Sequence, residues 1–134
     1  MKTKTKIILG VIILLLAILA FFGIRLLISV QEYQTAVANI VFEHVDASDI
    51  PDGVYFGEYD AQLVVASVEV TIENEAITDI RILEHRNGRG ADAEGIVKEM
   101  IAQQRIDVDA IAGATNSSTV IKKAVDNALS SAKR

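Results

Sequence analysis

The distribution of apolar and polar residues divides this chain into two parts. One is an unbroken apolar run, and in the other apolar and polar residues are interspersed. The run covers residues 7–24, eighteen positions without a charged or strongly polar side chain. A helix of that length, at about 1.5 Å per residue, nearly spans a hydrocarbon core of roughly 30 Å. Arg25 follows, but the apolar character continues through Ile28, and an arginine near the end of a span can reach the headgroups. The pattern predicts a single N-terminal transmembrane helix within residues 1–30.

A cleaved secretory signal is the alternative, because it also begins with basic residues. Its apolar region is shorter, about 7 to 15 residues, and small residues precede its cleavage site. Large side chains such as Phe21 and Phe22 occupy that zone here, which favours a retained anchor. Lys2, Lys4 and Lys6 precede the run, and the positive-inside bias keeps such a basic end in the cytoplasm. We expect a single-pass cell-membrane protein with an extracytoplasmic folded part.

Beyond the anchor, the pattern of apolar residues changes twice. Residues 31–45 place apolar side chains at helical spacing, which predicts an amphipathic stalk. Residues 46–53 contain the single proline and several turn-forming residues, which interrupt helices. The sequence therefore predicts a stalk and linker over residues 31–51 and a folded domain over residues 52–134.

Three stretches of the domain show the alternation of half-buried strands. They are residues 54–59, 63–72 and 77–85. Asn74 and Glu75 form a plausible two-residue turn between the last two stretches, so the three strands should form an antiparallel meander. The second stretch is predicted to bury Val64, Ala66, Val68, Val70 and Ile72 on one face.

Two later stretches show helical spacing. Asp92 is suited to cap a helix that ends near Gln104, and a last helix runs from about Ser117 to Ala132. A short extended piece, residues 105–111, lies between them. Strands followed by helices favour a small α+β domain, in which two helices cover one face of a mostly antiparallel sheet. The buried stripe of the last helix should comprise Ile121, Ala124, Val125, Ala128 and Leu129.

Charge and cysteine content narrow the range of functions. From Val30 onward nine basic residues stand against eighteen acidic ones, a net charge of −9. Nucleic-acid binding is excluded, because Lys and Arg contacts to phosphate supply most of that affinity. The chain has no cysteine, which excludes disulfides, iron–sulfur clusters and thioether-linked haem. With two histidines we expect no metal site, and redox chemistry would need an organic cofactor.

The segment that leads into the last helix carries the most informative chemistry. Gly113 and Ala114 are small, and Thr115, Ser117 and Ser118 place three hydroxyls at the start of the helix. Exposed backbone N–H groups and the positive end of the helix dipole favour an anion such as phosphate there. From the residues alone, a capped helix start and a phosphate site both remain open.

The segment Asp-Ala-Ile-Ala-Gly-Ala-Thr-Asn-Ser-Ser, at 109–118, resembles the flavinylation signature of the FMN-binding domain family, as does the helical pattern over 120–129. Residues 52–57 and 80–85 are similar to the family's opening strand and to its strand ending in histidine. The family includes the C subunit of sodium-pumping NADH:quinone oxidoreductase and the G subunit of Rnf-type complexes. The resemblance covers about residues 52–130.

This resemblance implies a role for each residue at the helix start. Thr115 would carry FMN through a phosphoester, which an FAD-dependent flavin transferase would make. Gly113 and Ala114 would let the bulky ligand approach the backbone. Ser117 and Ser118 would hydrogen-bond the attached phosphate together with backbone N–H groups.

The resemblance leaves more than one role open for several other residues. Asp109 would fix the turn or be recognised by the transferase. His85 would hydrogen-bond the isoalloxazine or be a solvated histidine at a strand end. Arg86 and Arg89 would favour the anionic reduced flavin or form a solvated basic loop. The aromatic residues of the first strand would stack on the flavin or belong to the core: Tyr55, Phe56 and Tyr59.

The predicted function is electron transfer. The membrane-anchored flavoprotein would relay electrons from a membrane-bound donor to an extracytoplasmic acceptor, with lipid around its anchor and no catalytic residue of its own. One alternative is an FMN-dependent reductase of a small molecule, with His85 and the tyrosines as candidate proton donors. The other is a membrane-anchored interaction domain without a cofactor.

Overall fold

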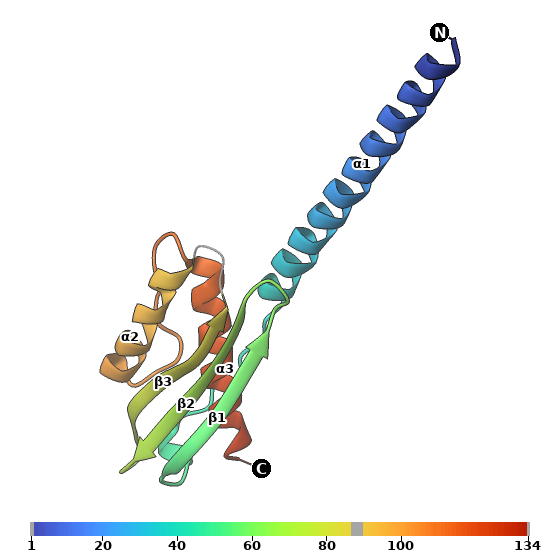
Figure 1. Cartoon of the computed structure of the whole chain (residues 1–134). Helices are drawn as coiled ribbons and strands as arrows, with labels where there is room; N and C mark the ends of the chain where they lie inside the picture. Colours follow the sequence, from blue (N-terminus) through green and yellow to red (C-terminus); the bar gives the residue numbers. More distant parts are fainter. Residues whose placement is uncertain (1, 87–89, 134) are drawn as a thin grey trace. The chain divides into compact units, whose positions relative to one another are not determined.

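The chain consists of two compact units. The computed structural model describes residues 2–86 and 90–133 (Figure 1). One unit ends at Glu32 and the other begins at Tyr33. Helix α1 (Lys2–Ala38) forms the first unit and contributes its last residues to the second.

Helix α1 carries the apolar run. Its large apolar side chains from Ile7 to Ile28 are all substantially exposed. A helix that is apolar all round suits a lipid environment better than water. Among the described residues, α1 is the one helix long and apolar enough to cross a membrane. The predicted N-terminal apolar helix is confirmed.

The helix ends earlier than its apolar spacing predicts. A helix was expected over residues 31–45, but α1 stops at Ala38 and the residues that follow are not helical. Ile40 and Phe42 pack against the core, whereas Val41 between them is 76% exposed. This alternation is that of an extended chain. The prediction is wrong beyond Ala38. The few apolar residues of this stretch are compatible with both helical spacing and the alternation of an extended chain, so their spacing does not distinguish the two.

The segment after α1 is part of the second unit. Val37 and Ile50 are buried in the core, and the segment contains a short 3-10 helix, η1 (Ala47–Asp49). The backbone N–H of Glu43 donates to both carboxylate oxygens of Asp126, at 3.2 and 3.0 Å. These contacts join the segment predicted as stalk and linker to the unit that contains the sheet.

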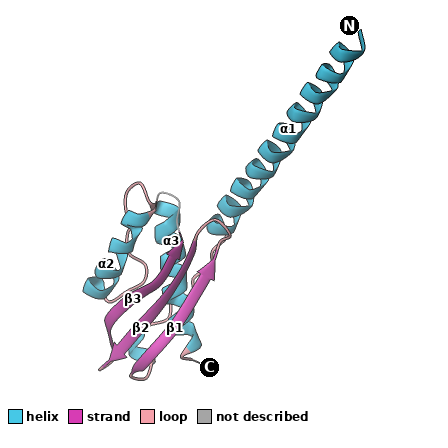
Figure 2. Cartoon of the chain, in the orientation of Figure 1, coloured by secondary structure: helices cyan, strands magenta, loops and turns pink. Residues whose placement is uncertain are grey.

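Three strands form the predicted antiparallel meander, in the order β1 (Gly53–Asp60), β2 (Val65–Glu73) and β3 (Ala76–Arg86) (Figure 2). Asn74 and Glu75 form the β2–β3 turn with φ of 53° and 63°. A two-residue type I′ hairpin turn requires positive φ at both of these positions. Val64 and the four alternating residues of β2 that follow are all buried, as predicted.

Two helices cover one face of this sheet. Helix α3 (Thr115–Ser131) packs against β1 and β2, and α2 (Ile96–Gln103) packs against β3. The predicted buried stripe of α3 is fully buried. On the other face, Phe56 and Leu83 are 61% and 50% exposed. The predicted α+β class, with helices packed on an antiparallel sheet, is confirmed.

The start of α2 differs from the prediction, whereas its end agrees. Asp92 does not cap the helix, because it lies inside a short 3-10 helix, η2 (Ala91–Gly95), in which Ala93 is completely buried. Packing of this turn against α3 therefore sets where α2 begins. At the other end, Gln104 is left-handed (φ 51°), and its side-chain amide binds the N–H and C=O of Ile77 at 2.8 Å each.

Candidate functional site

The start of α3 leaves backbone donors without helical partners. Thr115 is the first helical residue, two positions earlier than expected, and Ala114 before it makes no side-chain cap. The first intrahelical bond runs from the N–H of Ser118 to the carbonyl of Ala114, at 2.9 Å. Helix geometry therefore points the N–H groups of residues 115–117 beyond the helix end. Such an end favours an anion.

A tight turn brings the chain to this helix start. The N–H of Ala114 donates to the carbonyl of Ile111 at 3.0 Å. Gly113 within the turn has φ of 79°, which side chains rarely tolerate. A Cβ on Gly113 would meet no atom within 4 Å. The turn therefore needs glycine for its backbone conformation, and the space beside it is open.

A hollow of about 640 Å³ lies beside the helix start. Typical small-molecule sites measure roughly 300–1,000 Å³. The hollow is lined by residues 113–117 and by Leu63 and Val64 of the β1–β2 connection, among others. Figure 1 shows this connection and the start of α3 at the same end of the sheet. A helix end that favours anions thus adjoins apolar residues of the hollow.

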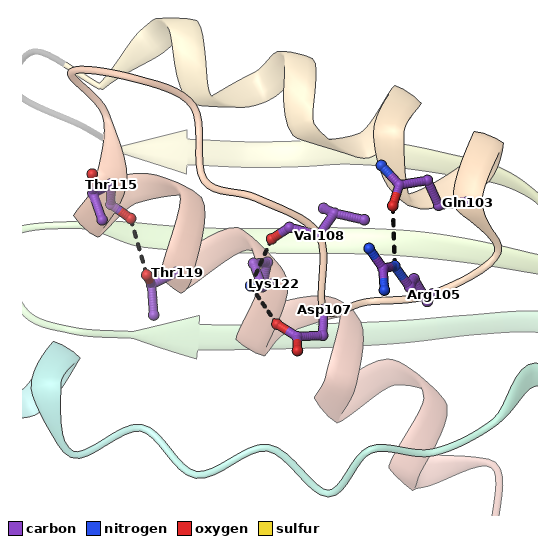
Figure 3. A network of polar contacts seen from close by, with 7 residues as sticks. All are labelled: Gln103, Arg105, Asp107, Val108, Thr115, Thr119 and Lys122. Atoms are coloured by element: carbon purple, nitrogen blue, oxygen red, sulfur yellow. Dashed lines mark hydrogen bonds and ion pairs between the residues drawn. The ribbon is translucent and has the colours of Figure 1, made fainter.

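Four predicted site residues meet at this hollow: Gly113, Ala114, Thr115 and Ser117. Thr115 is exposed, and its carbonyl accepts the hydroxyl of Thr119 at 2.9 Å (Figure 3). Ser117 is 6% exposed. The hydroxyl-bearing residue proposed for flavin attachment therefore lies at the surface, at the edge of a cavity.

Ser118 and Asp109 do not line the hollow. Ser118 is completely buried, and its hydroxyl oxygen accepts the N–H of Ile111 at 3.1 Å. This bond ties the loop before α3 to the first turn of the helix. Asp109 is exposed within that loop. A phosphate contact for Ser118 and a recognition role for Asp109 stay predictions.

His85 is buried. Its side chain is 1% exposed, and its Nδ1 lies 3.1 Å from Oε1 of Glu94. The interpretation as a solvated strand-end histidine is therefore wrong, and His85 is not among the residues that line the hollow. Arg86 donates from Nη2 to the carbonyl of Gln62 at 3.2 Å. Arg89 lies outside the described residues.

The aromatic residues of β1 also lie away from the hollow. Tyr55 and Tyr59 pack against the core, and the Tyr55 hydroxyl donates to the carbonyl of Pro51 at 2.8 Å. Phe56 is exposed on the open face of the sheet. The core interpretation is correct for the two tyrosines.

Two residues of the hollow carry no signal in the sequence that marks them as site residues. Tyr33 is half-buried against the core and lines the hollow together with Asn116. Burial raises the pKa of the Tyr33 hydroxyl, and the nearby Asn116 side chain partly offsets that rise. Tyr33 fits the apolar spacing of the predicted stalk, and Asn116 fits a helix start. Only the fold brings these distant positions together.

The loop that leads to the site is held by α3 and by its own residues. Lys122 on α3 donates to Asp107 at 3.2 Å and to the carbonyl of Val108 at 2.9 Å (Figure 3). The hydrogen bond and charge of Lys122 hold the pKa of the Asp107 carboxyl below its ordinary value. Arg105 donates from Nε to Gln103 at 3.0 Å. Within the described ranges, no cluster of His, Asp or Glu could hold a metal ion.

Residues 65–130 match the family model described as FMN-binding domain. The match runs from the start of β2 through all but the last residue of α3. No curated protein and no solved structure matches the chain. The residues at the α3 start fit the nucleotide that this family binds, because they combine outward backbone N–H groups, small side chains and an apolar wall.

Proposed function

We propose that this protein, whose residues 65–130 match the FMN-binding domain family, is a membrane-anchored flavoprotein that carries FMN on Thr115 and transfers electrons outside the cytoplasm. The observation that carries the proposal is the position of Thr115. It is an exposed hydroxyl residue at a helix end with outward N–H groups, and it borders a hollow of about 640 Å³.

Thr115 would be the acceptor in a transfer from FAD. A bond forms between its Oγ and the phosphorus of the FMN half, while the pyrophosphate bond of FAD breaks. AMP leaves, and the hydroxyl proton passes to the catalytic base of a separate flavin transferase. No Asp, Glu, His or Lys is among the described residues that line the hollow, which is consistent with a partner enzyme supplying this base.

The backbone around Thr115 would hold the resulting phosphodiester. The outward N–H groups of residues 115–117 and the helix dipole stabilise negative charge, with each such interaction at a helix end typically contributing about 0.3–1 kcal/mol. Gly113 leaves the approach to this position open. Ser117, at the edge of the hollow, is the hydroxyl placed to add a further hydrogen bond.

FMN, when bound, supplies reversible one- and two-electron redox chemistry. Helix α1 would anchor the domain in the membrane, with Lys2, Lys4 and Lys6 on the cytoplasmic side. Tethering raises the effective concentration of the domain near membrane partners. A membrane-bound donor and an extracytoplasmic acceptor are the partners that this arrangement suits. A small-molecule reductase would need a proton donor at the hollow. Of the candidates, Tyr33 lines the hollow, whereas the buried side chain of His85 does not.

The proposal is tested by producing the full chain together with a flavin transferase and measuring its mass and its fluorescence on a denaturing gel. We expect a mass increase of one FMN less one water, and a fluorescent band. Thr115→Val should abolish both, because it removes the acceptor oxygen while keeping the side-chain shape. Thr119→Val is the matched control and should keep the flavin, since its hydroxyl bonds only to the helix backbone.

Two results would contradict the proposal. Covalent flavin that persists in Thr115→Val would move the attachment to another hydroxyl of the segment. A wild-type chain that carries no flavin after production with an active transferase would rule out covalent FMN.

A further inference from the structure

We propose that Tyr33 forms the surface on which the flavin ring stacks. The inference rests on the proposed function, because it concerns the ring of a flavin attached to Thr115. It adds a residue from outside the family match, which begins at residue 65.

Tyr33 is the aromatic residue available at the site. It lines the same hollow as Thr115, and no other aromatic residue is among the described residues that line it. Its ring packs partly against the core, so its orientation is restricted. Planar aromatic systems attract each other in offset-stacked arrangements. A flavin ring entering this hollow would therefore meet an aromatic partner that is already in place.

Tyr33 lies near the proposed attachment residue. Asn116 follows Thr115 directly in the first turn of α3, and its side chain is near enough to the Tyr33 hydroxyl to lower the pKa that burial raises. Tyr33, Thr115 and Asn116 all line the hollow. A flavin attached to Thr115 would therefore have Tyr33 as a neighbour in the same hollow.

The rest of the wall is suited to a flat, largely apolar ring. Leu63 is 42% exposed and Val64 is buried, and both line the hollow. Buried Gly90 adds a stretch of wall without a side chain. Ligand sites of this kind combine apolar walls with a few polar groups. Here the polar groups lie at the α3 start, and Leu63 and Val64 of the β1–β2 connection supply apolar side chains.

Fluorescence can test this arrangement with little ambiguity. A tyrosine in contact with an excited flavin donates an electron to it, the electron then returns, and the fluorescence is quenched; phenylalanine is too poor a donor to do so. The chain contains three tyrosines and no tryptophan. Tyr55 and Tyr59 pack against the core and do not line the hollow. Quenching by a contacting side chain can therefore be assigned to Tyr33.

The experiment uses the full chain in detergent, loaded by a flavin transferase, with fluorescence normalised to covalent FMN measured by mass. Tyr33→Phe keeps the ring shape and should raise the fluorescence per flavin severalfold. Tyr59→Phe is the same substitution at a core tyrosine and should leave it unchanged. Unfolding in denaturant should raise the wild-type fluorescence to the level of unfolded Tyr33→Phe, because the flavin stays attached while the contact is lost.

The outcomes separate this inference from the proposed function. Covalent FMN with equal fluorescence in wild type and Tyr33→Phe would overturn the stacking role and leave the flavoprotein proposal intact. An equal rise in Tyr59→Phe would also overturn it. If the wild-type chain carries no FMN, the proposed function fails and the inference fails with it.

Discussion

Gly57 is the residue on which the packing of α3 against β1 depends most directly. A Cβ at this position would overlap the backbone of Ala124 and of Ala128. Both alanines are completely buried, so they cannot move aside unless the whole helix shifts. Protein interiors are packed as tightly as organic crystals, and such a shift would disturb many contacts at once. Glycine on the strand and alanines on the helix together permit the close approach.

Replacing Gly57 by alanine should therefore destabilise the domain. Overpacking a well-packed interior typically costs about 1–3 kcal/mol. We expect a lower midpoint of thermal unfolding for Gly57→Ala, measured by circular dichroism in detergent. Gly95→Ala is the control, because a Cβ there meets no atom within 4 Å and the φ of −62° suits alanine. Equal stability of the two variants would show that the helix accommodates the extra methyl group.

At the scale of elements, α3 organises the irregular segments on both sides of it. Lys122 binds the loop that leads to Gly113, and Asp126 binds the segment that follows α1 through the N–H of Glu43. Lys123 donates to buried Asp126 at 2.7 Å, so the negative charge of the buried carboxylate is paired. One helix therefore holds both irregular segments, the loop that leads to Gly113 and the segment that follows α1.

The contact between Lys122 and Asp107 makes a pH-dependent contribution to this arrangement. Lys122 lowers the pKa of the Asp107 carboxyl in the folded chain. A group with a lowered folded pKa stabilises the fold above its unfolded pKa, and that contribution is lost as the pH falls through the folded pKa. Because Asp107 is exposed, the contribution to stability should be small.

NMR titration of the Asp107 carboxyl measures this effect directly. In Lys122→Met we expect the pKa of Asp107 to rise towards the ordinary aspartate value of about 3.9. Lys98→Met removes a positive charge from the exposed surface of α2 and serves as the control, with no change expected at Asp107. An unchanged pKa in Lys122→Met would show that another group holds it down.

Elements could be predicted from the sequence where the spacing of apolar residues is regular over one continuous stretch of the chain. The alternation from Val64 to Ile72 needs no knowledge of distant residues, and the Asn74–Glu75 turn follows from its position between two strands. The stripe of α3 is equally local, since each buried residue recurs at helical spacing. The segment over 113–118 was identified for the same reason, because small and hydroxyl residues cluster before a helix.

Features that depend on distant contacts could not be predicted in this way. After α1 ends at Ala38, the N–H of Glu43 donates to Asp126, a residue far along the sequence. Tyr33 joins the site only because the fold places it beside Asn116. A local pattern cannot contain either pairing.

At the scale of the whole molecule, the chain joins an apolar helix to an acidic domain. In the proposed anchor, the helix would provide the membrane affinity. The domain would not add to it, because its net negative charge is repelled by anionic lipid headgroups. Orientation then depends on the basic residues before the apolar run. Lys2, Lys4 and Lys6 should keep the N-terminus in the cytoplasm, which would place a flavin on Thr115 where extracytoplasmic acceptors can reach it.

The absence of cysteine allows this orientation to be measured with single introduced thiols. Asp79 is exposed on β3 and Thr3 lies at the start of α1. In intact cells or spheroplasts, a membrane-impermeant maleimide should label Asp79→Cys, whereas Thr3→Cys should react only after lysis. The reverse pattern would place the domain in the cytoplasm and remove the proposed acceptor side. Recovery of a chain lacking the apolar run would instead indicate cleavage, because a retained anchor stays on the same polypeptide as the domain.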